Sequence, residues 1–141
     1  MAVPKAVEAR RFYHVAHQRL EDARLLLSKL QRAPAAIYLA GYAVECILKA
    51  MILTNTPVAK HRAMLSDEFR GSRAHSIVWL RERLRDTGAA AFPLEISRDL
   101  TFVSTWSVDL RYTPGVGDLE DAEQFVLAVE RILMFADGRL S

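Results

Sequence analysis

The stretch AAIYLAGYAVECILKAMIL, residues 35–53, decides the class of fold because it is long, apolar and almost free of charge. Its two charged residues, Glu45 and Lys49, are four positions apart, so on a helix both side chains leave the same face. A charge on a long apolar helix is costly to bury unless it is paired. The segment is therefore either a membrane span or the core helix of a bundle that carries one polar spot.

The core-helix interpretation is favoured over the membrane span. The segment is just long enough to cross a bilayer, but each central charge would cost about 2.5–3.5 kcal/mol on insertion. The sequence contains no second apolar span of this length. We therefore expect no membrane insertion.

Length and composition predict one globular domain over residues 1–141. The chain is 51% hydrophobic and 26% charged, and 141 residues can bury a sizeable core. A net charge of +2 excludes a strong electrostatic commitment to nucleic acid or to an anionic membrane. The single cysteine, Cys46, fits a reducing compartment, and the N-terminus has no pattern of a secretory signal. We expect a cytoplasmic protein.

The spacing of apolar residues predicts five helices. They cover residues 7–31, 34–54, about 75–85, 93 to a point before 114, and 118 onwards. Pro34 suits the first turn of the second helix, Gly88 ends the third, and Asp118 caps the fifth with Asp121 at the third helical position.

Residues 55–73 are polar and irregular, and are predicted to form a loop with room for a short helical turn. No segment alternates in the manner of a strand. The pattern predicts an all-α, antiparallel four-to-five-helix bundle with four long helices and one shorter helix.

Other chemical motifs are weak. His14 and His17 are three positions apart but have no third ligand at a known spacing, so we interpret them as part of a helix face. Cys46 lies in the apolar helix, where a thiol is buried and inert. The glycines of residues 115–117 are too few for a phosphate-binding loop. We expect no metal and no cofactor.

The pair Glu45 and Lys49 allows two interpretations. In one, it is an ion pair near the edge of the bundle, with Lys49 extending outward to solvent. In the other, Glu45 faces the interior and holds a cationic group from another helix. Arg111 is the best candidate for that group.

Aromatic and acidic residues surround Arg111 in the sequence. Trp106 and Asp109 precede it and Tyr112 follows it. A guanidinium held by a carboxylate beside aromatic rings suits a site for phosphate and stacked bases. The same arrangement equally suits a structural buried salt bridge.

Four segments together resemble the HEPN family, the higher-eukaryote and prokaryote nucleotide-binding domains. They are AGYAVECILKAMIL (40–53), FYHVAHQRLEDARLLL (12–27), AHSIVWLRERL (74–84) and DLRYTPGVGDLEDAEQFVLAVERIL (109–133). The resemblance covers nearly the whole chain in the right order. It implies an antiparallel helical bundle that commonly forms a homodimer.

The resemblance also implies a range of activities. Many family members are ribonuclease toxins encoded with a nucleotidyltransferase antitoxin, and others bind nucleotides or RNA without cutting. Active members carry an arginine, four to six residues, then a histidine. After Arg111 the matching positions hold Val116, Gly117 and Asp118, so the usual motif is missing there.

The same spacing occurs elsewhere in the chain. Arg10 or Arg11 has this spacing to His17, and Arg70 has it to His75. Arg70 and His75 flank a predicted helix start and could converge on an anion there. The simpler interpretation of His75 is that it caps the helix or contacts a loop carbonyl.

We therefore predict a protein that binds a nucleotide, RNA or a nucleotidyltransferase partner in a toxin–antitoxin-like setting. In this interpretation Arg111 contacts phosphate, Tyr112 and Trp106 form the cleft, and Glu45 orients the arginine. One alternative is a metal-independent endoribonuclease toxin that uses Arg70 and His75. Another is a structural dimer in which Glu45, Lys49 and Arg111 satisfy one another.

Overall fold

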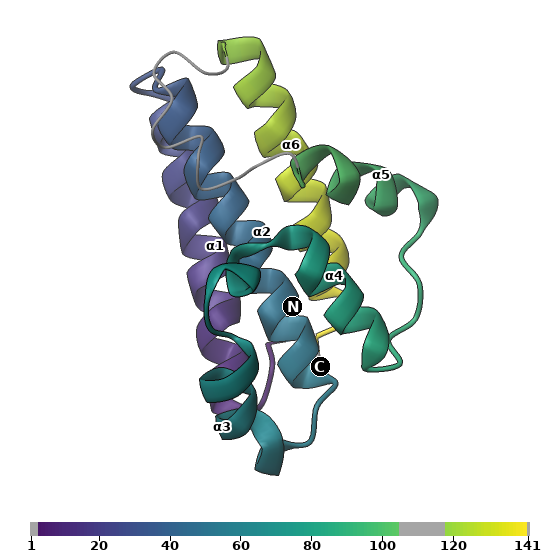
Figure 1. Ribbon diagram of the computed structural model, residues 1–141. Coiled ribbons are helices and arrows are strands. Elements are labelled where there is room, and N and C mark those ends of the chain that lie inside the picture. The colour runs from purple at the N-terminus through teal and green to yellow at the C-terminus, as the bar shows by residue number, and fades with distance from the viewer. Residues whose placement is uncertain (1–2, 105–117, 141) are drawn as a thin grey trace.

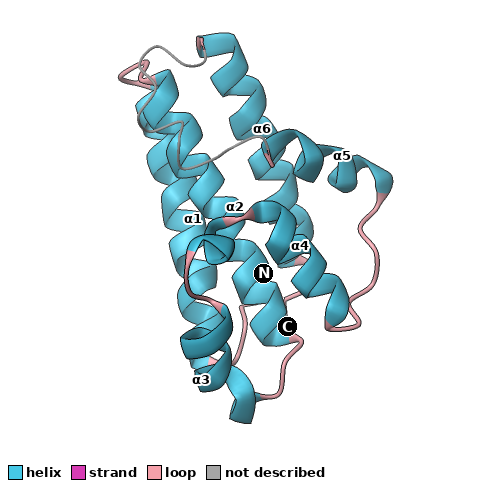
Figure 2. Ribbon diagram, in the orientation of Figure 1, coloured by secondary structure: helices cyan, strands magenta, loops and turns pink. Residues whose placement is uncertain are grey.

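The regular structure of the described residues is entirely helical. The computed structural model describes residues 3–104 and 118–140, and within these ranges it has no strand (Figure 2). The main helices are α1 (Val7–Ser28), α2 (Ala33–Thr54), α3 (His61–Ala63), α4 (Ile77–Asp86), α5 (Leu94–Val103) and α6 (Leu119–Asp137). The predicted all-α helical bundle is confirmed.

Helices α1 and α2 form an antiparallel hairpin (Figure 1). The chain reverses between them through Gln31, which has a left-handed φ of 52°. The backbone N–H of Arg32 donates to the carbonyl of Leu26 over 2.9 Å and closes the turn. The buried face of α1 has the predicted three-four spacing, with Ala9, Tyr13, Ala16, Leu20 and Ala23 facing inward. Small alanines on this face let the two backbones approach closely.

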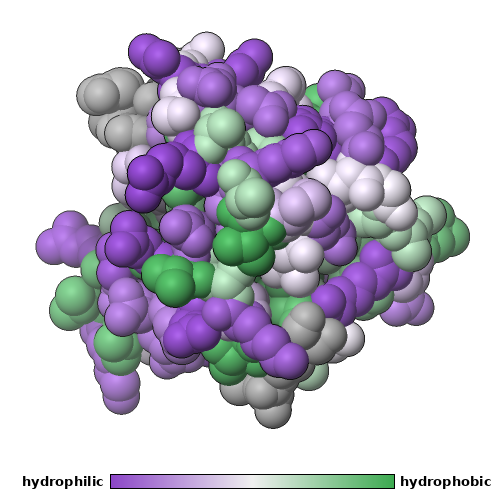
Figure 3. Space-filling view, turned by 90° about the horizontal axis from the view of Figure 1, so that it is seen from below, coloured by the Kyte–Doolittle hydropathy of each residue, from purple (hydrophilic) through white to green (hydrophobic). Residues whose placement is uncertain are grey.

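Helix α2 is the centre of the bundle. Every residue from 43 to 53 is buried, which covers three full turns on all sides. Helices α1, α4 and α6 pack around it. By length and composition α2 could cross a membrane, but 83% of its most apolar window is buried inside the structure. Hydrophilic residues cover most of the surface seen from below, with hydrophobic residues in small separate patches (Figure 3).

Helices α4 and α5 have ten residues each and are shorter than α1, α2 and α6. Ser76 caps α4, and Gly88, with a φ of 83°, follows its end in a conformation that favours glycine. The described part of α5 ends at Val103, and its predicted continuation through Trp106 lies outside the described residues. The helix predicted over about 75–85 and ended by Gly88 corresponds to α4, the expected shorter helix.

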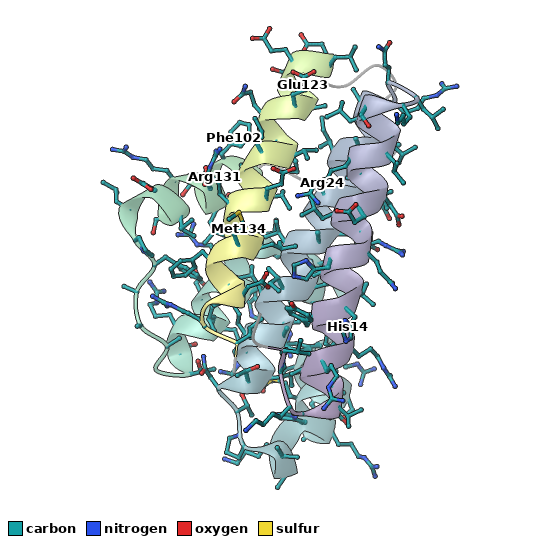
Figure 4. All side chains as sticks on the ribbon, turned by 180° about the vertical axis from the view of Figure 1, so that it is seen from behind. His14, Arg24, Phe102, Glu123, Arg131 and Met134 are labelled. Carbon is teal, nitrogen blue, oxygen red and sulfur yellow. The ribbon has the colours of Figure 1, made fainter. Side chains whose placement is uncertain are left out.

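Helix α6 is attached to both of its neighbours by ion pairs. The Oδ1 of Asp118 accepts the N–H of Asp121 over 2.8 Å, which confirms the predicted cap. Three ion pairs then fix α6 in place: Arg24–Glu130 and His17–Asp137 to α1, and Arg131–Asp99 to α5. In Figure 4, Arg24 lies between α1 and α6, whereas Arg131 lies on the side of α6 that faces α5.

The segment predicted as a loop is largely wound into short turns. Between α2 and α4 lie η1 (Val58–Lys60), α3, the π-helical η2 (Met64–Glu68) and η3 (Ser72–His75). The buried ring of His61 anchors this segment, because its Nε2 lies 2.7 Å from the carbonyl of Leu53 and 2.8 Å from that of Thr56. Leu53 lies in the last turn of α2 and Thr56 just beyond its end, so the ring ties the segment to the end of this helix.

We expect Leu48→Ala to lower the free energy of unfolding by about 2–5 kcal/mol, because it leaves a cavity in a fully buried site. The matched control is Leu25→Ala, since Leu25 is 56% exposed, and it should change stability by less than about 0.5 kcal/mol. Urea denaturation followed by circular dichroism measures both. Equal effects in the two variants would contradict the central position of α2.

Candidate functional site

The charged pair of α2 is buried inside the bundle. The Nζ of Lys49 lies 3.0 Å from the Oε2 of Glu45, and the side chains are 8% and 3% exposed. The interpretation in which Lys49 extends to solvent at the bundle edge is therefore wrong. The prediction that Glu45 faces the interior is confirmed. The two residues are one helical turn apart, which brings their charged groups together. Because both side chains are buried, each charge needs an opposite charge beside it.

Two aromatic rings enclose the ammonium group of Lys49. Its Nζ lies 5.6 Å from the ring centroid of Phe12 on α1, and 5.6 Å from that of Phe69. The two rings also contact each other edge to face, with centroids 6.1 Å apart. Both distances are within the range of a cation–π interaction. The charge of Lys49 is thus compensated by one carboxylate and two ring faces.

His75 joins Glu45 and Lys49 as the third member of a polar cluster. Its Nδ1 lies 3.2 Å from Oε1 and 3.3 Å from Oε2 of Glu45, across 30 residues of sequence. The imidazole is 43% exposed, although the carboxylate that holds it is buried. Because an ionised carboxylate only accepts hydrogen bonds, Nδ1 is the protonated nitrogen in this contact. Nε2 has no hydrogen-bond partner among the described residues.

The structure therefore corrects the simple interpretation of His75. The residue that caps α4 is Ser76, whose Oγ accepts the N–H of Trp79 over 3.2 Å. His75 makes no contact with a loop carbonyl in the part of the chain that the structure describes; it pairs with Glu45 instead.

No hydrogen bond joins Arg70 to His75 among the described residues. Its side chain is exposed, and within the described ranges it has no hydrogen bond or ion pair. The arginine that organises this segment is Arg73, which donates to the carbonyls of Asp67 and Glu68 over 2.9 and 3.2 Å. Its guanidinium also stacks 5.1 Å from the ring of Trp79. Arg70 thus remains free to turn toward a ligand.

The segment that carries His75 is attached to α4 by a second ion pair. Arg83 donates to both carboxylate oxygens of Glu68 over 2.7 and 3.1 Å. This hydrogen bonding from the guanidinium lowers the pKa of Glu68 below its ordinary value. The contact holds η2 against α4 and so limits the movement of Phe69 and the residues that follow.

Four residues predicted for the site lie outside the described residues. They are Trp106, Asp109, Arg111 and Tyr112. The predicted contact between Glu45 and Arg111 therefore stays a prediction. Sequence reasoning missed Phe12 and Phe69 as ring partners of Lys49. Apolar spacing shows that Phe12 belongs to a buried face of α1 but not what its ring contacts, and Phe69 lies in an irregular segment with no periodic signal.

The remaining chemical candidates have structural roles. His17 pairs with Asp137, with Nε2 3.0 Å from Oδ1. Among the described residues no group of three or more His, Cys, Asp and Glu side chains is placed to hold a metal. Cys46 is buried, and burial raises the pKa of its thiol to about 12. The neighbouring carboxylate of Glu45 acts in the same direction.

Comparison with known proteins identifies the family. A family model of the HEPN domain matches residues 9–139. The chain therefore belongs to the HEPN domain family.

A solved structure supports the assignment at the level of the fold. This chain is similar to the crystal structure of an archaeal HEPN homologue, with a TM-score of 0.65 and 21% sequence identity. The match covers 95% of this chain and 98% of that one. A search of curated proteins found no significant match.

We expect Glu45→Gln to lower the free energy of unfolding by about 3–5 kcal/mol, because it leaves the ammonium of Lys49 buried without an opposite charge. Urea denaturation at neutral pH measures the change. In the double variant Glu45→Gln with Lys49→Met no buried charge remains, so it should recover much of this loss.

The control is the exposed pair of Glu21 and Arg24 on α1. Glu21→Gln should cost less than about 1 kcal/mol, because solvent screens an exposed pair. If Glu45→Gln were no more costly than Glu21→Gln, the buried pair would not be the constraint that we describe.

We expect Cys46 to resist iodoacetamide at pH 9 in the folded protein and to react in guanidinium chloride. The folded state keeps its thiol protonated, whereas an unfolded thiol loses its proton near pH 8.5. By linkage, stability falls as pH rises above that value, since the folded state then binds more protons. Cys46→Ala should lose less stability between pH 8 and 10. Rapid alkylation of the folded protein would refute this assignment.

Proposed function

We propose that this HEPN-family protein binds a nucleotide or RNA, with His75 contacting a phosphate group. The single observation that supports the proposal is that a buried carboxylate holds a half-exposed imidazole. Glu45 fixes Nδ1 of His75, which leaves Nε2 for a ligand. The contact needs no rearrangement of the bundle.

The chemistry of a histidine held in this way suits a phosphate. When the ring is protonated, Nε2–H donates to an anionic oxygen while Nδ1–H donates to Glu45. The carboxylate also fixes the orientation of the ring, as partners behind catalytic and ligand-binding histidines commonly do. Because Lys49 already balances the charge of Glu45, a cationic His75 adds net positive charge to this spot.

The sequence adds a second contact to the proposal. We propose that Arg111 binds phosphate, with Tyr112 and Trp106 as stacking surfaces for bases. The family supports this part of the proposal, as it supports a homodimer and a nucleotidyltransferase partner. Arg70, exposed near His75 in sequence, is a further cation for the ligand.

A second candidate function is cleavage of RNA, and the same pair of Glu45 and His75 favours it. Nε2 of a neutral His75 would take the proton of a ribose 2′-hydroxyl, whose oxygen attacks the adjacent phosphorus. The 5′-oxygen of the next nucleotide leaves and takes up a proton, so a 2′,3′-cyclic phosphate and a 5′-hydroxyl result. Arg70 would stabilise the charge on the pentacoordinate phosphorus.

We expect His75→Ala to weaken binding of a fluorescein-labelled single-stranded RNA by about tenfold, measured by anisotropy. The matched control is His14→Ala, because His14 is an exposed histidine on α1 outside this cluster, and it should bind as the unaltered protein does. Arg111→Ala should weaken binding and reduce its dependence on salt concentration, because one phosphate contact is lost. ATP as a competitor tests whether a nucleotide takes the same site.

The same proteins and RNA test cleavage on a denaturing gel. If the second candidate holds, His75→Ala lowers the rate about 100-fold or more, and His14→Ala does not. Binding that is unchanged in both His75→Ala and Arg111→Ala would overturn the first proposal. Equal cleavage by His75→Ala and the unaltered protein would overturn the second.

A further inference from the structure

A separate cavity lies between α4, α5 and the connection that joins them. Its volume is about 380 Å³, which is within the range of small-molecule sites. Val78, Leu84 and Phe92 give it apolar walls, and Ser97 adds a hydroxyl. Arg81 and Arg85 also line it. His75 and Glu45 do not line this cavity, so it is distinct from the site described above.

Arg81 and Arg85 have no acidic partner among the described residues. They are four positions apart on α4, where like charges destabilise a helix. Arg81 is half-buried, and its Nη1 donates to the hydroxyl of Thr101 over 3.3 Å, its one hydrogen bond within the described ranges. Burial, and then the charge of Arg85, lower the pKa of Arg81 below its ordinary value.

No carboxylate among the described residues pairs with Arg81 or Arg85 to offset the repulsion between them. Within the described ranges neither guanidinium forms an ion pair, although Glu82 also lines the cavity. Two nearby arginines differ in this respect, since Arg83 is paired with Glu68 and Arg131 with Asp99. The cavity therefore contains one more positive than negative side chain.

Arg139, which does not line the cavity, contacts the wall formed by Ala90, Ala91 and Phe92. Arg139, near the end of α6, donates to the carbonyls of Ala90 and Ala91 over 2.8 and 3.1 Å. Its guanidinium also lies 5.7 Å from the ring centroid of Phe92. These bonds engage two carbonyl oxygens that would otherwise be free to repel an anion, and they fix Phe92 in place.

We propose that this cavity binds a small phosphate monoester, with the phosphate between Arg81 and Arg85 and the organic group against Phe92 and Val78. A phosphate oxygen can accept from each guanidinium, which removes the repulsion between them. The apolar walls then favour an ester over inorganic phosphate. The proposal does not depend on RNA or nucleotide binding at His75.

Isothermal titration with phenyl phosphate tests the proposal, with phenol and inorganic phosphate as comparison ligands. We expect saturable binding of phenyl phosphate, weaker binding of inorganic phosphate and the weakest binding of phenol. The double variant Arg81→Gln with Arg85→Gln should bind phenyl phosphate at least about tenfold more weakly, because two charge-assisted hydrogen bonds are lost.

Further variants serve as controls for this titration. Arg62→Gln removes an exposed arginine of α3 and should change the affinity by less than about twofold. His75→Ala should keep saturable binding of phenyl phosphate, because His75 does not line the cavity. Without ligand, Arg85→Gln should melt at the same temperature as the unaltered protein or higher, and with phenyl phosphate it should melt lower.

Three results would overturn the proposal. One is equal binding of phenyl phosphate by the double variant and the unaltered protein. Another is phenol binding as tightly as phenyl phosphate, which would make the cavity merely apolar. The third is the absence of saturable binding up to about 10 mM, or its loss in His75→Ala.

Discussion

The buried ion pair of Glu45 and Lys49 is the constraint on which the rest of the site depends. A lysine at this depth requires a carboxylate within reach, and the helix provides one a single turn away. The carboxylate has capacity for a further donor, which the structure fills with His75. The ammonium in turn draws Phe12 and Phe69 around it. One polar spot on α2 thereby attaches the segment between α2 and α4 to the core, and presents an oriented imidazole at the surface.

Periodicity and end signals predicted most of the fold. The second helix was expected over 34–54 and the structure has α2 at Ala33–Thr54, because an apolar run bounded by Pro34 and Pro57 leaves little freedom. The cap at Asp118 was also correct. The prediction was coarsest over residues 55–73, where a loop with room for one short helical turn was expected and turns of several kinds alternate. Their partners, such as the carbonyls that hold His61, are distant in sequence and leave no repeat to detect.

Only the part of the site that lies within one helix, the pair of Glu45 and Lys49, could be predicted from residue spacing. A separation of four residues places Glu45 beside Lys49, but it does not say which side chain arrives from another element. Arg111 was chosen as that partner for its charge and its aromatic neighbours, whereas the described partner is His75, 30 residues away. The histidine had been assigned to the helix cap because it precedes α4 in sequence. Ser76, one residue later, was the better cap by residue type.

The order of the helices along the chain has a consequence for synthesis and folding. The hairpin of α1 and α2 is made of contacts that are local in sequence, so we expect it to form early. Helix α2 is apolar on nearly all sides, and α1 alone cannot cover it. Its remaining cover comes from α4 and, last of all, from α6. A growing chain on the ribosome therefore exposes the apolar surface of α2 until α6 emerges, and this interval is when a chaperone would have the most surface to bind.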